Sequence, residues 1–135
     1  MEKRIIPARL DCLDDATGFV EQILERAGFS EEKKLQVHLV VEEIFVNIAS
    51  YAYENGNGKM NLRIEETEDP HTVEITFTDS GIPYDPLAKD DPDVTLTAEE
   101  RQIGGLGIFM FKKMMDDVRY EYKDGKNVLT LIKNL

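Results

Sequence analysis

The chain has 135 residues, and 41% of them are hydrophobic, which predicts a single domain with one core. Its 27 acidic side chains outnumber its 16 lysines and arginines, so the formal net charge at pH 7 is −11. This charge repels a phosphate backbone and an anionic membrane surface. We therefore expect neither nucleic acid nor a membrane as a partner.

The first residues and the cysteine content predict a cytoplasmic protein. Residues 1–7 lack the apolar core of a signal peptide, and no apolar run reaches the length of a membrane span. Cys12 is the only cysteine, so no internal disulfide can form. With two histidines besides, the sequence contains no Cys/His spacing of a zinc site. We expect Cys12 to be an ordinary reduced thiol.

The first part of the chain predicts two helices. Asp14 or Asp15 can cap the first helix, which carries apolar residues at helical spacing and stops at Gly28. Ser30 is a natural N-cap for the second helix, which we expect to run to about Tyr53. A turn-forming run rich in glycine and asparagine then breaks it.

Alternation with a period of two predicts short strands along the rest of the chain and at its beginning. The strands are expected over residues 4–8, 60–64, 73–77, 118–122 and 128–132. Asp124-Gly125 suits a tight hairpin between the last two. Residues 80–105 hold three prolines and little periodicity, which is typical of a functional loop, and a helix is expected over 106–115.

The order of these elements favours an α/β two-layer sandwich. Hairpins outnumber crossovers, so we expect a mixed, mostly antiparallel sheet with helices packed on one face. A doubly wound parallel sheet would need strands that alternate regularly with helices, which this order does not provide. A single domain should cover residues 1–135.

A carboxylate and an amide lie four residues apart in the second predicted helix. Glu43 and Asn47 therefore share one face, where their oxygens can converge on a cation or a water molecule. Asn47 offers a neutral oxygen ligand for Mg²⁺, and Glu43 can polarise a nucleophilic hydroxyl or water. The alternative is a solvated pair on a charged helix face, because this spacing is weak evidence in isolation.

The strand expected over 73–77 leads into Asp79-Ser80-Gly81. An aspartate at a strand end can accept a hydrogen bond from an exocyclic amine, and Gly81 lets a flat ligand approach the backbone. These two residues suit an adenine ring. The alternative is a plain turn, since Asp and Gly both favour turns.

A glycine-rich segment stands where the irregular loop ends and an apolar helix begins. Its residues are Gly104, Gly105, Leu106 and Gly107. Backbone N–H groups there can surround phosphates, with the helix N-terminus adding a positive dipole. Arg101 can add a mobile positive charge near a γ-phosphate. The alternative is a flexible hinge or close helix packing, and no Walker A motif occurs in the chain.

In this order, the three segments resemble the N box, G1 box and G2 box of the gyrase, MutL and histidine-kinase ATPase superfamily. The likeness extends to the bacterial anti-sigma-factor serine/threonine kinase branch and covers roughly residues 5–133. It is carried further by residues 79–86, 105–108, 118–120 and 127–131.

The resemblance implies a Bergerat-type fold that binds ATP between sheet, helices and an ATP lid at about residues 80–105. Mg²⁺ would join Asn47 to the phosphates, and Glu43 would accept the proton of a serine or threonine hydroxyl that attacks the γ-phosphate. The implied acceptor is a STAS-type anti-sigma-factor antagonist. In such kinases the same surface region also binds a sigma factor, often in a homodimer.

Three positions depart from the pattern of this family. Pro83 replaces the second glycine of D-x-G-x-G and stiffens the loop. Tyr51 stands where some relatives have a histidine, so we assign it no catalytic role. Gly125 is not followed by the threonine that often helps to frame adenine, which leaves Asn127 or Thr130 as substitutes.

We therefore predict an ATP-dependent serine/threonine protein kinase that acts as an anti-sigma or partner-switching regulator, with Glu43 and Arg101 as catalytic residues. One alternative is a non-catalytic ATP-binding switch that regulates a phosphatase or another partner. Another is an interaction domain without a nucleotide. Glu43 distinguishes the first two, because a pure binder needs no base beside a metal ligand.

Overall fold

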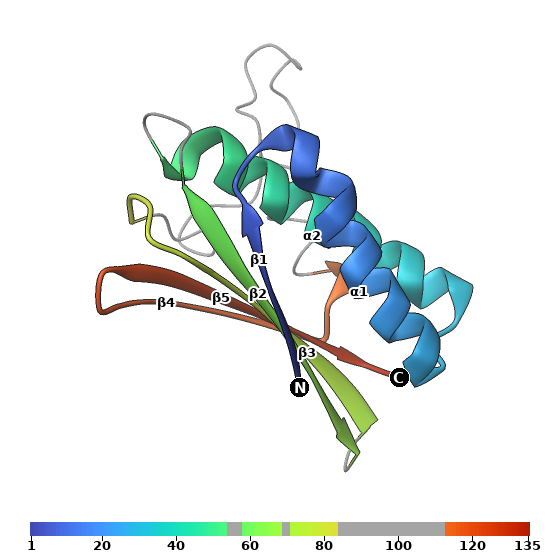
Figure 1. Cartoon of the computed structure of the whole chain (residues 1–135). Helices are drawn as coiled ribbons and strands as arrows, with labels where there is room; N and C mark the ends of the chain where they lie inside the picture. The colour runs from blue at the N-terminus through green and yellow to red at the C-terminus, as the bar shows by residue number, and fades with distance from the viewer. Residues whose placement is uncertain (54–57, 69–70, 84–112) are drawn as a thin grey trace, which may run out of the picture.

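The computed structural model is a five-stranded sheet with two helices (Figure 1). It describes four stretches of the chain, residues 1–53, 58–68, 71–83 and 113–135. In chain order, the strands and helices are β1 (Glu2–Pro7), α1 (Leu13–Ala27), α2 (Glu31–Asn47), β2 (Lys59–Glu68), β3 (His71–Asp79), β4 (Asp117–Lys123) and β5 (Lys126–Asn134). None of the described helices is long and apolar enough to cross a membrane.

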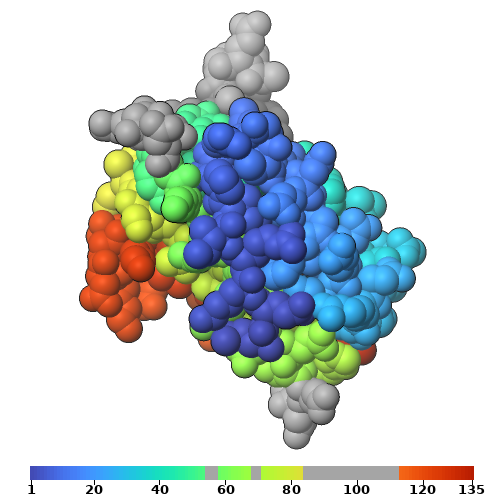
Figure 2. All heavy atoms as spheres, viewed as in Figure 1, coloured from blue at the N-terminus to red at the C-terminus, as the bar shows by residue number. Residues whose placement is uncertain are grey.

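The sheet has the strand order β1-β2-β3-β5-β4, and its four pairings are all antiparallel. Helices α1 and α2 lie side by side against one face of it (Figure 1). Figure 2 shows the helical side chains, in blue and cyan, in direct contact with strand residues. The prediction of a two-layer sandwich is confirmed, and the described residues contain no parallel pairing.

The core lies between the helices and this face of the sheet. Phe45 of α2 and Phe77 of β3 are its largest fully buried side chains. Leu129 and Leu131 of β5 belong to the same cluster. Because successive side chains of a strand point to opposite faces, Thr130 lies on the other face, away from the helices.

Helix α1 begins earlier than the sequence predicts. Its first residue is Leu13, and Asp14 and Asp15 lie in the first turn, where their charges favour the helix dipole. Neither caps the helix, so that prediction is wrong. Asp15 instead pairs with Arg4 at 2.6 Å and ties α1 to β1. Gly28 ends the helix as predicted, with a φ of 87°.

Helix α2 begins at its predicted cap, because Ser30 Oγ accepts a hydrogen bond from the backbone N–H of Lys33 at 3.2 Å. The α-helix ends at Asn47, and residues Ile48–Ala52 form a π-helical turn. The helical stretch thus has the predicted extent to Tyr53, but its last part has a different pitch. Turns of this type are frequent at functional sites.

The predicted strands are all present. The first spans Glu2–Pro7, slightly before its predicted range, and the others extend beyond theirs. The β4–β5 hairpin turns at Asp124 and Gly125, whose φ angles are 54° and 75°, as a two-residue turn of this type requires. Residues 84–112, with most of the predicted loop and third helix, lie outside the described part.

Gly28→Ala should lower the free energy of unfolding by about 1–2 kcal/mol, because alanine is strained at the positive φ of this residue. A Cβ there would meet no atom within 4 Å, so no steric clash adds to this cost. Gly18→Ala, inside α1 and equally free of contacts, should raise it by roughly 0.5–1 kcal/mol. Urea unfolding of both variants measures the two effects. Changes of the same sign would contradict the backbone explanation.

Candidate functional site

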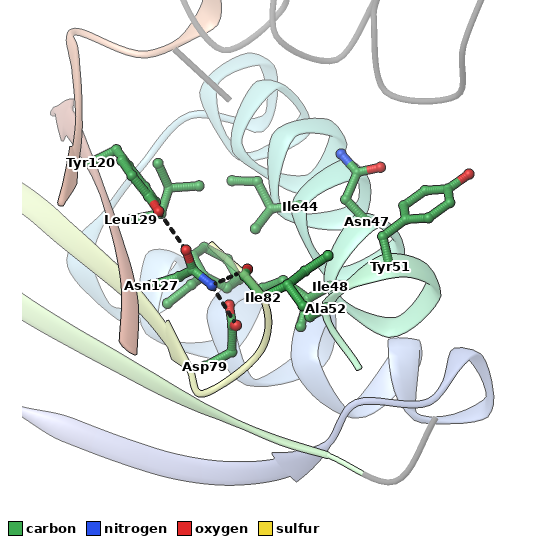
Figure 3. A pocket seen from close by; sticks show the side chains of 11 residues that line it. Ile44, Asn47, Ile48, Tyr51, Ala52, Asp79, Ile82, Tyr120, Asn127 and Leu129 are labelled. Atoms are coloured by element: carbon green, nitrogen blue, oxygen red, sulfur yellow. Dashed lines mark hydrogen bonds between the residues drawn. The ribbon is translucent and has the colours of Figure 1, made fainter. Parts of the chain in front are cut away.

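A pocket opens between α2, the π-helical turn and the neighbouring ends of β3 and β5 (Figure 3). Asn47 and Asp79, from separate motifs of the sequence, both line it. Its apolar wall is formed by Ile44, Ile48, Ala52, Phe77, Ile82 and Leu129. An apolar slot with a few polar groups at its edges is the usual form of a small-molecule site.

Asp79 ends β3 and is only 6% exposed. Its Oδ1 accepts hydrogen bonds from the backbone N–H of Gly81 at 2.9 Å and from Asn127 Nδ2 at 3.0 Å. Both bonds use the same oxygen. Within the part of the chain that the structure describes, Oδ2 is left to accept a donor from a bound molecule.

Asn127 lies beside Asp79 as its direct partner on the neighbouring strand β5, and it holds the Asp79 carboxylate (Figure 3). Its Nδ2 also donates to the carbonyl oxygen of Ile82 at 2.8 Å, and its Oδ1 is hydrogen-bonded to the hydroxyl of Tyr120. Asn127 is 6% exposed. Its amide therefore fixes the carboxylate and the turn that follows it.

The two residues proposed to frame the ligand lie on different faces of the sheet. Asn127 lines the pocket, whereas Thr130 does not. In β5 the buried positions alternate, and Thr130 pairs with Thr76 and Arg119 on the face away from the helices. Thr130 lies three positions along β5 from Asn127, and this odd offset puts it on the opposite face, outside this pocket. Its choice as a cofactor-binding residue stays a prediction.

Gly81 is needed for a reason that the sequence does not reveal. A Cβ at this position would lie 2.2 Å from the carbonyl oxygen of Ala52 and 2.6 Å from its Cβ. The same carbonyl accepts a hydrogen bond from the backbone N–H of Ile82 at 2.9 Å. The close approach that requires glycine here is therefore between the turn after β3 and the π-helical turn.

Glu43 and Asn47 interact, as their spacing predicts. The Asn47 side chain is close enough to the Glu43 carboxylate to lower the pKa of that carboxyl as a hydrogen-bond donor does. Its amide nitrogen is the donor, because a carboxylate only accepts. Asn47 Oδ1 is buried, and among the described residues it has no hydrogen-bond partner. An orphaned amide oxygen at the rim of a pocket suits a hard cation such as Mg²⁺.

The environment of Glu43 makes it a better base than an exposed glutamate. Burial raises the pKa of its carboxyl, and repulsion from Glu42 raises it further, while the hydrogen bond from Asn47 opposes both. A raised pKa strengthens a general base near neutral pH.

The described residues contain no group of three metal-binding acidic, His or Cys side chains. A cation at Asn47 would thus need oxygens from water or from a bound phosphate.

Several residues predicted for the site lie outside the described part of the chain. They are Arg101, Gly104, Gly105, Leu106 and Gly107. Of the predicted lid, only residues 80–83 are described. The roles assigned to these residues stay predictions.

Sequence reasoning missed two tyrosines near the pocket. Tyr120 bonds Asn127, and Tyr53 bonds the turn after Asp79. The alternation of β4 could have indicated that Tyr120 faces inward. No sequence pattern identifies Tyr53, because its contacts join segments that lie far apart in the chain.

The chain matches the histidine kinase-like ATPase domain over residues 6–133, and it belongs to this family. The match covers both halves of the pocket, from the helix that carries Asn47 to the strand that carries Asn127. The resemblance drawn from the three motifs is therefore confirmed.

Two of the similar proteins are protein kinases by name. The chain is 29% identical to the serine/threonine-protein kinase BtrW of Bordetella bronchiseptica over 118 residues, which covers 87% of this chain and 82% of that protein. It is 28% identical to the serine-protein kinase RsbW of Listeria monocytogenes over 128 residues, which covers 92% of this chain and 81% of that one.

Two solved structures share the fold. The RsbU and RsbW domains of a Mycobacterium tuberculosis protein superpose with a TM-score of 0.65 at 11% identity, over all of this chain and 33% of that one. The SiaB–SiaC complex from Pseudomonas aeruginosa gives 0.61 at 16% identity, over all of this chain and 90% of that one. At these identities, the likeness concerns the fold alone.

Asn47→Leu should raise the pKa of the Glu43 carboxyl, because leucine keeps the site buried but cannot donate the hydrogen bond that stabilises the carboxylate. NMR titration of the glutamate side-chain carbons measures this shift. Ser50→Ala, a change at an exposed position nearby, should leave the titration as it is. An unchanged or lower pKa of Glu43 in Asn47→Leu would contradict the assignment.

Proposed function

We propose that this protein is an ATP-dependent serine/threonine protein kinase that acts as an anti-sigma or partner-switching regulator. The observation that carries the proposal is a single pocket that both Asp79 and Asn47 line, with Glu43 one helical turn before Asn47. In the described part of the chain, Asp79 offers a carboxylate oxygen that no donor occupies and Asn47 an amide oxygen without a partner, while Glu43 is a base with a raised pKa. Membership of the ATPase family and the protein kinases among its relatives support it.

The adenine ring is assigned to the apolar end of the pocket. There Asp79 Oδ2 would accept a hydrogen bond from the exocyclic amine, and the aliphatic wall would cover the ring faces. Asn127 already bonds Asp79, Ile82 and Tyr120. Its role is therefore to hold the carboxylate in place.

The phosphate end is assigned to the side of Asn47. Mg²⁺ held by Asn47 Oδ1 would supply charge neutralisation for the phosphates. In the proposal, the backbone N–H groups of residues 104–107 surround the phosphates, and Arg101 stabilises charge near the γ-phosphate. Phosphoryl transfer requires mainly such positioning and charge stabilisation, so a small set of residues suffices.

Glu43 would act as the base of the transfer step. The oxygen of an acceptor serine or threonine forms a bond to the γ-phosphorus, and the bond from that phosphorus to the bridging oxygen breaks, which releases ADP. The hydroxyl proton passes to the Glu43 carboxylate. The hydrogen bond from Asn47 would orient this carboxylate towards the nucleophile.

The acceptor proposed is a STAS-type anti-sigma-factor antagonist, and a sigma factor is proposed as a second partner. The relatives named as RsbW and BtrW kinases support this class of partner, and the structural neighbour SiaB was solved in a complex with SiaC. A homodimer and a cytoplasmic location complete the proposal.

Asp79→Asn should abolish ATP binding, because an amide whose oxygen keeps the bonds from Gly81 and Asn127 turns its NH2 group, a donor, towards the adenine amine. Isothermal titration with ATP and Mg²⁺ measures the affinity. Asp124→Asn, at the exposed hairpin tip where asparagine tolerates the positive φ, is the matched control. If Asp79→Asn binds ATP with wild-type affinity, the assignment of Asp79 to the purine is wrong.

Glu43→Gln should keep ATP affinity but slow phosphoryl transfer by roughly 10²–10⁴-fold, the usual contribution of a general base. Radiolabelled ATP, Mg²⁺ and a purified STAS-type acceptor give the rate. Glu21→Gln, an exposed glutamate of α1, serves as the control for loss of charge. If Glu43→Gln transfers phosphate at the wild-type rate, the non-catalytic ATP-binding switch becomes the better explanation.

A further inference from the structure

Tyr53 joins the turn after Asp79 to the end of the second helical stretch. Its hydroxyl accepts a hydrogen bond from the backbone N–H of Ser80 at 2.9 Å and donates one to the carbonyl oxygen of Lys59 at 2.7 Å. One hydroxyl thus connects the residue after the π-helical turn, the start of β2 and the residue that follows β3.

The same turn is attached to the helical stretch at a second point. Ile82 donates its backbone N–H to Ala52, and Gly81 lies too close to Ala52 for any side chain. The N–H groups of Ser80, Gly81 and Ile82 are therefore bonded to Tyr53, Asp79 and Ala52 in turn. Each of these three backbone N–H groups thus has an acceptor. Two of the acceptors belong to Ala52 and Tyr53, which follow each other in the chain after α2.

The Tyr53 ring is itself held in position. A Cβ at Gly58 would lie 1.9 Å from the ring carbon Cε2, so only glycine leaves room for the ring there. The ring and the hydroxyl are thus fixed by different partners. Removal of the hydroxyl alone should leave the ring in place.

We propose that Tyr53 is a positioning residue for nucleotide recognition, which rests on the function proposed above. Its hydroxyl fixes the Asp79 turn against the helical stretch that carries Asn47, so that the purine-binding and cation-binding oxygens keep a constant separation. Ser80 and Lys59 are exposed, so water can replace the lost partner when the hydroxyl is removed. The fold then survives, and the fixed position of the carboxylate is lost.

The test compares Tyr53→Phe with wild type on two nucleotides. ATP carries the exocyclic amine, and purine riboside triphosphate carries hydrogen in its place. Tyr53→Phe should bind ATP roughly two- to tenfold more weakly, the worth of one hydrogen bond, and should keep wild-type affinity for the analogue. A general loss of structure would weaken both nucleotides alike, and that result would overturn the positioning role.

Tyr122→Phe is the matched control, since Tyr122 is an exposed tyrosine of β4 whose hydroxyl makes no hydrogen bond to the turn within the described residues, and it should bind both nucleotides as wild type does. If wild type prefers ATP and Tyr53→Phe keeps the full preference, the role of Tyr53 is overturned and the proposed function stands. If wild type itself shows no preference for ATP over the analogue, the proposed contact between Asp79 and the purine is wrong, and so is the role of Tyr53.

Hydrogen exchange adds a measurement that needs no nucleotide. In the free protein, the Ser80 amide should exchange faster in Tyr53→Phe than in wild type and in Tyr122→Phe, because its acceptor is gone. Equal exchange rates for this amide in all three proteins would overturn the inferred attachment.

Discussion

The hydrogen bonds to Asp79 Oδ1 are the constraint on which the site depends. A carboxylate that is 6% exposed is stable only when donors replace its lost water, and here one donor comes from the turn and the other from β5. Both donors approach the same oxygen. The protein thereby satisfies the charge and still leaves an acceptor directed at the pocket.

Local signals in the sequence were sufficient for most of the fold. The alternation of apolar residues predicted each strand, Ser30 marked the start of α2, and the Asp124-Gly125 pair marked the last hairpin. The spacing of Glu43 and Asn47 predicted their contact, because helical geometry alone brings residues four apart together. These features depend on neighbours in sequence, so sequence reasoning can reach them.

The rest depends on contacts between distant segments. Whether Asn127 or Thr130 faces the pocket is decided by the register of β5, which a one-residue shift would reverse. Gly81 was predicted for a ligand, but the atom that approaches it is the Ala52 carbonyl oxygen. The cap of α1 was misplaced because Leu10–Cys12 form a 3-10 turn that leads directly into the helix at Leu13, which puts Asp14 and Asp15 in its first turn.

The π-helical turn lets α2 bury its apolar face while the chain that follows still fits the turn after β3. Up to Asn47, the rotation of the helix is set by the apolar residues that it buries, whereas the chain from Ala52 onward must match the turn after β3. One extra residue per turn shifts the rotational phase between these segments. During evolution, the length of Ile48–Ala52 should thus be far less free to vary than the β4–β5 hairpin tip, where an insertion would disturb no second element.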